Sequence, residues 1–199
     1  MASCVGIDLA GVATRSTGLA QMHQGKTSVT IAVGHSDQEI IEFIEQARPN
    51  IIVIDAPLSL PRGRESIEKR SNIHFRECDR ELTRRRIRFF PITLGPMRKL
   101  TSRGIALADR LRNCDYLIFE GYPGAAQDIL GIPRKGEGVE ALAEGLRNLG
   151  LEFRKDATHD ELDAVTCAYV GLLHIANQSE LIGDEQEGQI LLPRQNNTA

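Results

Sequence analysis

The sequence CVGIDLAG at residues 4–11 decides the fold. Its first four residues form a short apolar run, which stops at an acidic residue, Asp8. The next three residues, Leu9, Ala10 and Gly11, lead away from that acid. A short apolar run followed by such a turn is typical of a buried strand that ends in a loop. We therefore expect the first strand of a sheet to end at Asp8.

Two more apolar runs in the chain also stop at an acid. Residues 51–54 are followed by Asp55, and residues 116–119 are followed by Glu120. Continuous apolar runs favour strands that are covered on both faces, as in parallel sheets. Ligands bind at the carboxyl ends of such strands, because loops from several strands converge there. We therefore expect all three acids at one edge of the sheet.

The segments around these runs predict the remaining elements. Residues 16–22 and 27–33 flank a short glycine-containing connection, which predicts an antiparallel hairpin. Ser36 and Thr158 each have Glu three residues later and so predict helix starts with capping boxes. A helix is expected between Glu137 and Leu149, and a last short strand at residues 189–192. The predicted class is α/β, a mixed sheet flanked by helices.

Length and composition indicate one folded domain. The chain has 199 residues, of which 41% are hydrophobic and 26% charged, values that exclude a disordered chain. We expect a single domain over residues 1–199, with a helical insertion at about residues 57–115. The four cysteines are widely spaced and are expected to be reduced thiols. No leader and no apolar stretch of membrane-spanning length is evident, so the expectation is a cytoplasmic protein without a membrane partner.

The insertion is strongly basic. Residues 62–112 hold thirteen Arg and two Lys against six acidic residues, a net charge of +9, and the rest of the chain carries −12. Such a block suggests a surface that meets an anionic partner. A solvated helical face explains the same composition. The candidates for contact with phosphate are His74, Arg76, Arg80 and Arg84, because Arg binds phosphate oxygens in a bidentate manner.

The acidic residues predict a cation site. Asp160 and Asp163 lie three residues apart at the start of a predicted helix and so share one face of it. Joined to the three strand acids, they would concentrate negative charge, which divalent cations neutralise; hard oxygen ligands suit Mg²⁺ or Mn²⁺. Each acid taken alone is also explained as a turn former or as a residue that complements a helix dipole.

Five short segments together share a pattern with one known family. They are VGIDLAG at 5–11, IDAPL at 54–58, RECDR at 76–80, EGYPG at 120–124 and HDELDA at 159–164. This set, spread over about residues 4–175, resembles the family known as domain of unknown function 429. Members of that family are regarded as predicted nucleases with a ribonuclease H-like fold, similar in plan to Holliday-junction resolvases of the RuvC type.

The resemblance implies a five-stranded mixed sheet and a set of metal ligands. The ligands would be Asp8 on the first strand, Asp55 on the fourth, and Asp160 or Asp163 on the last helix. Glu120 matches the family motif but comes from the fifth strand. The implied function is a Mg- or Mn-dependent nuclease acting on nucleic acid, in which two ions about 4 Å apart clamp the scissile phosphate. Because resolvase-like relatives are dimers, the resemblance also allows a homodimer.

His159 has two explanations. An imidazole titrates near neutral pH, so His159 beside Asp160 could shuttle a proton to the leaving group. As the neighbour of a capping box, it could equally be a packing residue.

Two other functions fit parts of the sequence. Residues 6–11 also look like the first phosphate loop of sugar kinases and actin-like ATPases, which would make the protein a phosphotransferase. Those enzymes bind ATP between two duplicated domains, whereas this length allows one, and no GxxxxGK[ST] loop occurs. A catalytically inactive nucleic-acid-binding module is the second alternative. The aromatic content of 5% leaves few residues for base stacking in such a module.

Overall fold

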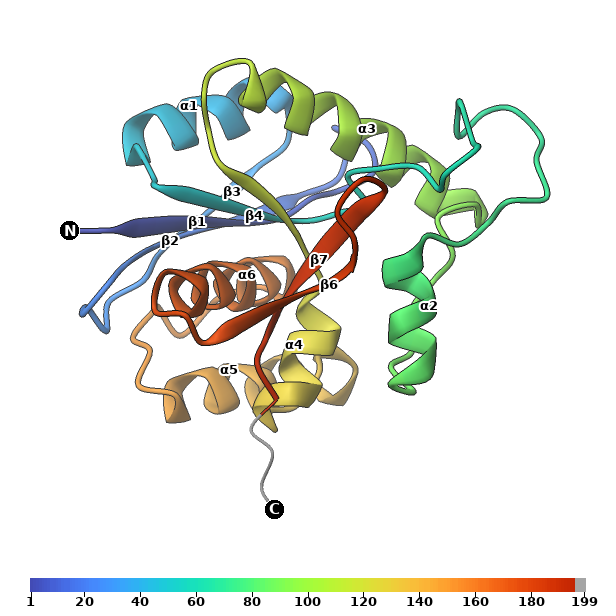
Figure 1. Cartoon of the computed structure of the whole chain (residues 1–199). Coiled ribbons are helices and arrows are strands. Elements are labelled where there is room, and N and C mark those ends of the chain that lie inside the picture. Colours follow the sequence, from blue (N-terminus) through green and yellow to red (C-terminus); the bar gives the residue numbers. More distant parts are fainter. Residues whose placement is uncertain (196–199) are drawn as a thin grey trace.

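A seven-stranded mixed sheet forms the centre of the computed structural model, which describes residues 1–195. The strand order is β3-β2-β1-β4-β5-β7-β6 (Figure 1). Strands β1, β4, β5 and β7 are mutually parallel, whereas β2 pairs antiparallel with β1 and β3, and β6 pairs antiparallel with β7. The strands are β1 (Ser3–Asp8), β2 (Thr17–His23), β3 (Thr30–Gly34), β4 (Ile51–Asp55), β5 (Ile118–Gly121), β6 (Ser179–Asp184) and β7 (Gly188–Pro193).

The mixed α/β class predicted from the sequence is confirmed, but the sheet is larger than the five strands implied by the resemblance. The additional pair is the hairpin β6-β7, of which residues 189–192 were expected as a strand and residues 179–184 were not. Strand β5 is also displaced from its predicted position. It runs on to Gly121, so that Glu120 lies within the strand rather than after it.

Helices cover both faces of the sheet (Figure 1). On one face lie α1 (Asp37–Ala47) and α3 (Gly95–Arg112). On the other lie α4 (Pro123–Leu130), α5 (Val139–Asn148) and α6 (His159–Ile175). A shorter helix, α2 (Glu77–Arg84), packs against the β6-β7 hairpin through Cys78 and Leu82. The predicted capping boxes open α1 at Ser36 and α6 at Thr158.

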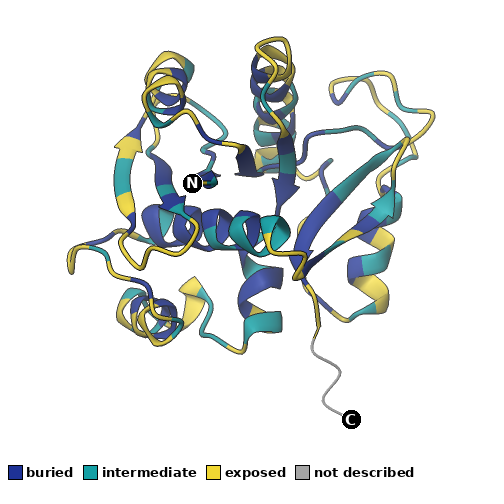
Figure 2. Cartoon of the chain, turned by 60° about the vertical axis from the view of Figure 1, so that its left-hand side comes forward, coloured by how far each residue is buried: buried dark blue, intermediate teal, exposed yellow. Residues whose placement is uncertain are grey.

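Alternation along β4 divides the core between the two faces. Ile52 and Ile54 pack with the apolar residues of α1 and α3, whereas Ile51 and Val53 pack on the opposite face with residues of α4 and α6. Successive side chains of a strand point to opposite faces, so both faces of this central strand are buried. Figure 2 shows the resulting burial of α6, which lies between the sheet and the outer helices.

Two glycines let α6 lie unusually close to the sheet. A Cβ atom at Gly6 of β1 would lie 2.0 Å from the carbonyl oxygen of Ala164, and one at Gly18 of β2 would lie 1.9 Å from that of Asp160. Such contacts are far inside van der Waals distance, so only glycine fits at either position. The first turns of α6 are thereby pressed against the carboxyl end of β1.

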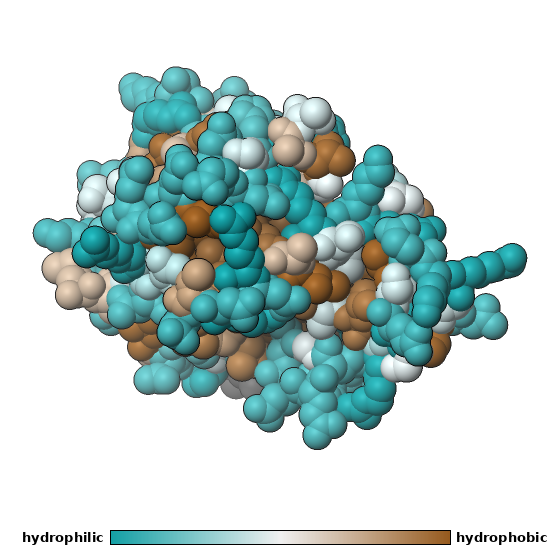
Figure 3. Space-filling view, turned by 90° about the horizontal axis from the view of Figure 1, so that it is seen from above, coloured by the Kyte–Doolittle hydropathy of each residue, from teal (hydrophilic) through white to brown (hydrophobic). Residues whose placement is uncertain are grey.

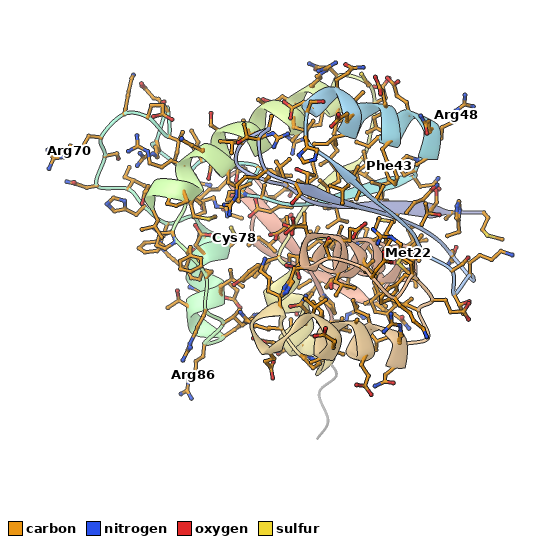
Figure 4. All side chains as sticks on the ribbon, turned by 180° about the vertical axis from the view of Figure 1, so that it is seen from behind. Met22, Phe43, Arg48, Arg70, Cys78 and Arg86 are labelled. Carbon is orange, nitrogen blue, oxygen red and sulfur yellow. The ribbon has the colours of Figure 1, made fainter. Side chains whose placement is uncertain are left out.

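The chain between β4 and β5 forms the basic insertion and contains α2 and α3. Two arginines of this insertion, Arg70 in its loop and Arg86 just after α2, point away from the body of the protein (Figure 4). Seen from above, the molecule is mostly hydrophilic, with apolar side chains exposed in patches between the polar ones (Figure 3). Among the helices of residues 1–195, none combines the length and the apolar character that crossing a membrane requires.

Candidate active site

Asp8 and Asp55 are paired across the two central strands. They are the last residues of β1 and β4 and lie directly opposite each other in the parallel register. Neighbouring strands are about 4.8 Å apart, and paired residues point to the same face. Because Ile7 and Ile54 point toward α1 and α3, both acids point to the opposite face, where α6 lies.

Asp163 of α6 brings a third carboxylate to this point. Its side chain is buried, with 2% of the residue exposed. Its Oδ1 accepts a hydrogen bond of 2.7 Å from Nε2 of Gln127, and its Oδ2 lies 2.8 Å from Nζ of Lys135. Both carboxylate oxygens are therefore held in place by neighbouring side chains.

Asp8 and Asp55 lie in an electrostatic environment that disfavours their charged forms. Burial raises the pKa of Asp8 well above its usual value, and the charges of Asp55 and Asp163 raise it further. Burial likewise raises the pKa of Asp55, to about 7, with Asp163 as the next cause. Lys135 opposes both shifts. Burial and the mutual repulsion of the acids both penalise their ionised forms, and a bound cation would relieve that penalty.

Lys135 is a member of the site that the sequence did not reveal. It opens a short 3-10 turn (Lys135–Glu137) in the connection between α4 and α5. Burial lowers the pKa of Lys135, but Asp163 and Asp8 outweigh burial and raise the pKa above its ordinary value. Its ammonium group therefore stays charged. A single Lys in a glycine- and proline-containing connection carries no pattern from which this position could be read.

Glu120 lines the same cavity as the three acids, and its charge adds to the raised pKa of Asp55, but its carboxylate is held by other partners. It is paired with Ile54 in the register of β4 and β5, and therefore points to the face opposite Asp8 and Asp55. Its oxygens accept hydrogen bonds of 2.6 and 2.7 Å from the guanidinium of Arg76, and one of 2.8 Å from the backbone N–H of Leu58. In place of the expected role near a metal, the structure gives Glu120 a buried ion pair.

Arg76 also differs from its expected role as a phosphate ligand. Its exposure is 2%, and its guanidinium bonds both Glu120 and Asp79, the latter at 3.0 Å. A guanidinium with two carboxylate partners has its fork of donors occupied. The ion pair instead ties the start of α2 to β5.

The other basic candidates lie apart from the acid cluster. Arg80 and Arg84 are exposed on α2, where both pair with Glu77, and Nδ1 of His74 lies 3.0 Å from Oγ1 of Thr93. Within residues 1–195, neither cavity that borders the acids includes any of these three in its lining. We expected these three side chains to flank the acids, and the structure places them elsewhere.

Asp160 and His159 lie at the margin of the cluster. Asp160 accepts a hydrogen bond from the hydroxyl of Ser16, and its charge contributes to the raised pKa of Asp8. His159 is the first residue of α6 and is half-buried. In the described part of the chain it lines neither of the cavities beside the acids.

Two cavities meet at the acid cluster. The first, of about 480 Å³, is lined by Asp8, Asp55 and Asp163 and by apolar side chains of the insertion. The second, of about 690 Å³, lies beside Asp8 and Asp160 and is bordered by the loop after β1 and the start of α3. Asp8 and Lys135 line both cavities, so Asp8 can be reached from either side.

The arrangement does not form a complete metal site. Among residues 1–195, no group of three or more His, Cys, Asp or Glu side chains is placed to hold a metal ion. The donors are nevertheless of the right kind, because carboxylate oxygens are the ligands that Mg²⁺ and Mn²⁺ prefer. The mutual repulsion of the acids contributes to the raised pKa values of Asp8 and Asp55, and Lys135 supplies one positive charge at Asp163.

The order of the strands defines the fold class of this protein. Its first five strands follow the order β3-β2-β1-β4-β5 with an antiparallel second strand. This is the strand order of a ribonuclease H-like fold. The chain belongs to the family described as "Protein of unknown function (DUF429)", which matches residues 6–187.

Two solved structures are similar to the chain at low identity. One is RuvC of Thermus thermophilus, with a TM-score of 0.48 and 12% identity over 88% of this chain and 96% of that one. The other is T. thermophilus RuvC in complex with a Holliday junction substrate, with a TM-score of 0.46 and 16% identity over 88% and 93% of the two chains. A comparison with curated proteins gave no match.

Proposed function

We propose that this protein is a nuclease that hydrolyses phosphodiester bonds with the help of divalent metal ions. The observation that supports this most directly is the register pair of Asp8 and Asp55, completed by Asp163 of α6. Two acids at the carboxyl ends of neighbouring parallel strands occupy the position where ligands bind in α/β sheets. Their raised pKa values mark them as a functional-site candidate with a stated physical cause.

Mg²⁺ or Mn²⁺ is the cofactor that fits these donors. Asp8, Asp55 and Asp163 would hold the ion or ions, with Asp160 at the margin. When bound, a divalent ion lowers the pKa of a water molecule and stabilises negative charge on the phosphate. Because Lys135 contacts Oδ2 of Asp163, this side chain has to turn away before that oxygen can bind a metal.

The chain's own residues prepare the site. Gln127 holds Oδ1 of Asp163 and so fixes the direction of the carboxylate. Lys135 remains charged and can donate to a phosphate oxygen once it leaves Asp163. Such positioning of charged groups before reaction is the main contribution of a protein to phosphoryl transfer chemistry.

Nucleic acid is the proposed substrate. Residues 62–112 of the insertion carry a net charge of +9, insertion residues line both cavities at the acids, and Arg70 and Arg86 extend from the insertion (Figure 4). Basic side chains that neutralise phosphates supply most of the affinity of non-specific nucleic-acid binding. An insertion of this charge beside an acidic site is consistent with binding of the backbone next to the point of cleavage.

Cleavage assays with a matched pair of variants test the proposal. Labelled DNA and RNA in single-stranded, duplex and branched forms are incubated with Mg²⁺, Mn²⁺ or EDTA. We expect metal-dependent cleavage by the wild type, near-complete loss in Asp8→Asn, and no loss in Asp109→Asn, which removes an exposed acid of α3. Binding without cleavage of any form would contradict the proposal and favour the inactive binding module. Saturable ATP binding would favour the phosphotransferase.

A further inference from the structure

The two cavities that meet at Asp8 and Lys135 differ in chemical character. The first is lined by Phe89, Phe90 and Tyr122 together with the acids. Two arginines also line it, Arg76 and Arg134, and each is paired with a carboxylate. The second is lined by Arg15 and Lys99 beside Ser16 and Asp160. One side of the acid cluster therefore offers aromatic surface, and the other offers positive charge.

The first cavity presents an exposed aromatic ring on a loop that is fixed by contacts with its neighbours. Phe90 is 68% exposed and lies outside the hydrophobic core. Its neighbour Phe89 packs edge-on against Phe75, with ring centroids 6.2 Å apart. The hydroxyl of Tyr122 donates to the carbonyl oxygen of Arg88 and so ties the same loop to the start of α4. An exposed aromatic ring on a loop held in this way can stack on a ligand with little ordering cost.

The polar side can carry phosphate. Arg15 follows β1 in the loop beside Asp8, and Lys99 lies in the second turn of α3. Both side chains are exposed, and Lys135 joins them from the boundary between the two cavities. Three cationic groups around one hollow favour an anion with extended negative charge, such as a nucleic-acid backbone.

We infer that the substrate is an unpaired nucleotide strand that spans both cavities. One base stacks on Phe90 in the first cavity, its phosphate lies at Asp8 and Lys135, and the neighbouring phosphate lies near Arg15 and Lys99. This inference rests on the proposed nuclease function and adds the form of the substrate. A cavity of about 480 Å³ is within the range of about 300–1,000 Å³ that holds small ligands.

The combination of features excludes an intact duplex as the preferred ligand. Bases in a duplex are stacked inside, so an aromatic side chain cannot reach a base face without unstacking it. Proteins that bind single strands combine aromatic stacking surfaces with a basic groove along the backbone. The two cavities provide both parts at one site.

Binding measurements with four probes test this inference. Fluorescence anisotropy is measured with a labelled 12-mer of thymidine, the matching uridine 12-mer, a fully abasic 12-mer and a 12-base-pair duplex. Ca²⁺ is present to neutralise the acids. It replaces Mg²⁺ because its coordination is looser, and gels check that the probes stay intact. We expect the wild type to bind the thymidine or the uridine strand at least tenfold more tightly than the abasic strand and the duplex.

Two sets of variants separate the cavities. Phe90→Ala should weaken binding of the preferred single strand about tenfold and leave the abasic strand unchanged, whereas Leu117→Ala, which truncates an exposed residue outside both cavities, should change neither. Arg15→Ala and Lys99→Ala should weaken the single and abasic strands alike and reduce the salt dependence by about 0.7 per charge. Lys26→Ala on the β2-β3 connection is the matched control. Circular dichroism checks that every variant is folded.

The outcomes distinguish this inference from the proposed function. Equal affinity for all four probes, absence of binding, or the same effect from Phe90→Ala and Leu117→Ala would overturn the unpaired-strand inference. Metal-dependent cleavage that is lost in Asp8→Asn would still support a nuclease in that case. If binding follows the expected pattern but no form is cleaved, the nuclease proposal fails and the preference for unpaired strands stands.

Discussion

The ammonium of Lys135 lies 2.8 Å from Oδ2 of Asp163 and joins the connection after α4 to the central helix α6. The two partners differ strongly in burial, since the side chain of Lys135 is 54% exposed and that of Asp163 is 3% exposed. A buried acid thus receives its compensating charge from a side chain that can move into solvent. The pair satisfies Asp163 in the absence of another cation and can be opened when one binds.

Replacement of Lys135 by Met tests this competition. Without the ammonium, three acids face one another with less compensation, so the metal-free protein at pH 8 should lose about 1–2 kcal/mol of stability. The same change should strengthen Mg²⁺ binding about tenfold, because no side chain then has to leave Asp163. Thermal melting over a Mg²⁺ titration measures both effects. Lys155→Met is the control, and weaker Mg²⁺ binding in Lys135→Met would contradict the competition.

The stability of the metal-free protein should depend on pH through Asp8 and Asp55. Their pKa values are raised in the folded state, so the folded protein binds these protons more tightly than the unfolded chain does. Their contribution is fully present below the unfolded pKa of about 4 and is lost as pH rises through the folded pKa. We expect stability to fall between about pH 5 and pH 8 in EDTA and to be restored by Mg²⁺.

Urea unfolding at a series of pH values measures this dependence. Asp55→Asn should flatten the profile, because the variant removes the group whose pKa burial raises to about 7. Asp109→Asn should keep the profile of the wild type. A profile that rises over this pH range in EDTA would show that the acids are not destabilised in the folded state.

Gly6 should be essential to the close packing of α6 against β1. An added Cβ would lie 2.0 Å from the carbonyl oxygen of Ala164 and 2.4 Å from the backbone nitrogen of Ala168, and both atoms belong to the backbone of α6, which cannot move aside as a flexible side chain can. Gly6→Ala should therefore cost about 3 kcal/mol or more and displace Asp163 from Asp8. Gly95→Ala, where no atom lies within 4 Å of the added carbon, should leave stability nearly unchanged. Melting temperatures that match for the two variants would contradict this account of the packing.

The positions of Asp8 and Asp55 could be predicted from the sequence, because both residues end predicted strands. Apolar runs that stop at Asp8 and Asp55 place both acids at one edge, because parallel strands share their direction. The position of Glu120 could not be read in this way, since a change of one residue in register moves a side chain to the other face. Its run resembles the other two, and only the pairing with Ile54 shows that it points away.

The roles of Arg76 and Lys135 could not be predicted from the sequence for a related reason. Arg76 is one of thirteen Arg residues in the insertion, and its burial depends on Glu120, which lies 44 residues further along the chain. Lys135 reaches the acids through the fold of a connection rather than through periodicity. Both are long-range pairings, for which composition and local spacing carry no signal.

The buried pair of Arg76 and Glu120 is expected to stabilise the fold rather than to bind metal. Glu120→Gln keeps the size of the side chain but leaves a buried guanidinium with one carboxylate fewer, which should cost about 3–5 kcal/mol. Arg76→Met should cost a similar amount because it leaves Glu120 unpaired. The double variant should be more stable than the sum of the two losses predicts, by about 0.5–3 kcal/mol, because the partners interact directly.

Measurements of metal binding distinguish a structural role of Glu120, as the partner of Arg76, from the role near a metal that was expected from the sequence. Glu120→Gln should retain stabilisation by Mg²⁺, since Glu120 points to the face opposite Asp8 and Asp55. Asp8→Asn should lose that stabilisation without loss of stability in the metal-free state, because it removes one of several mutually repelling charges. Urea unfolding with and without Mg²⁺ gives both quantities for each variant. If Glu120→Gln instead kept its stability and lost the effect of Mg²⁺, Glu120 would be a metal ligand and its pairing with Arg76 would be secondary.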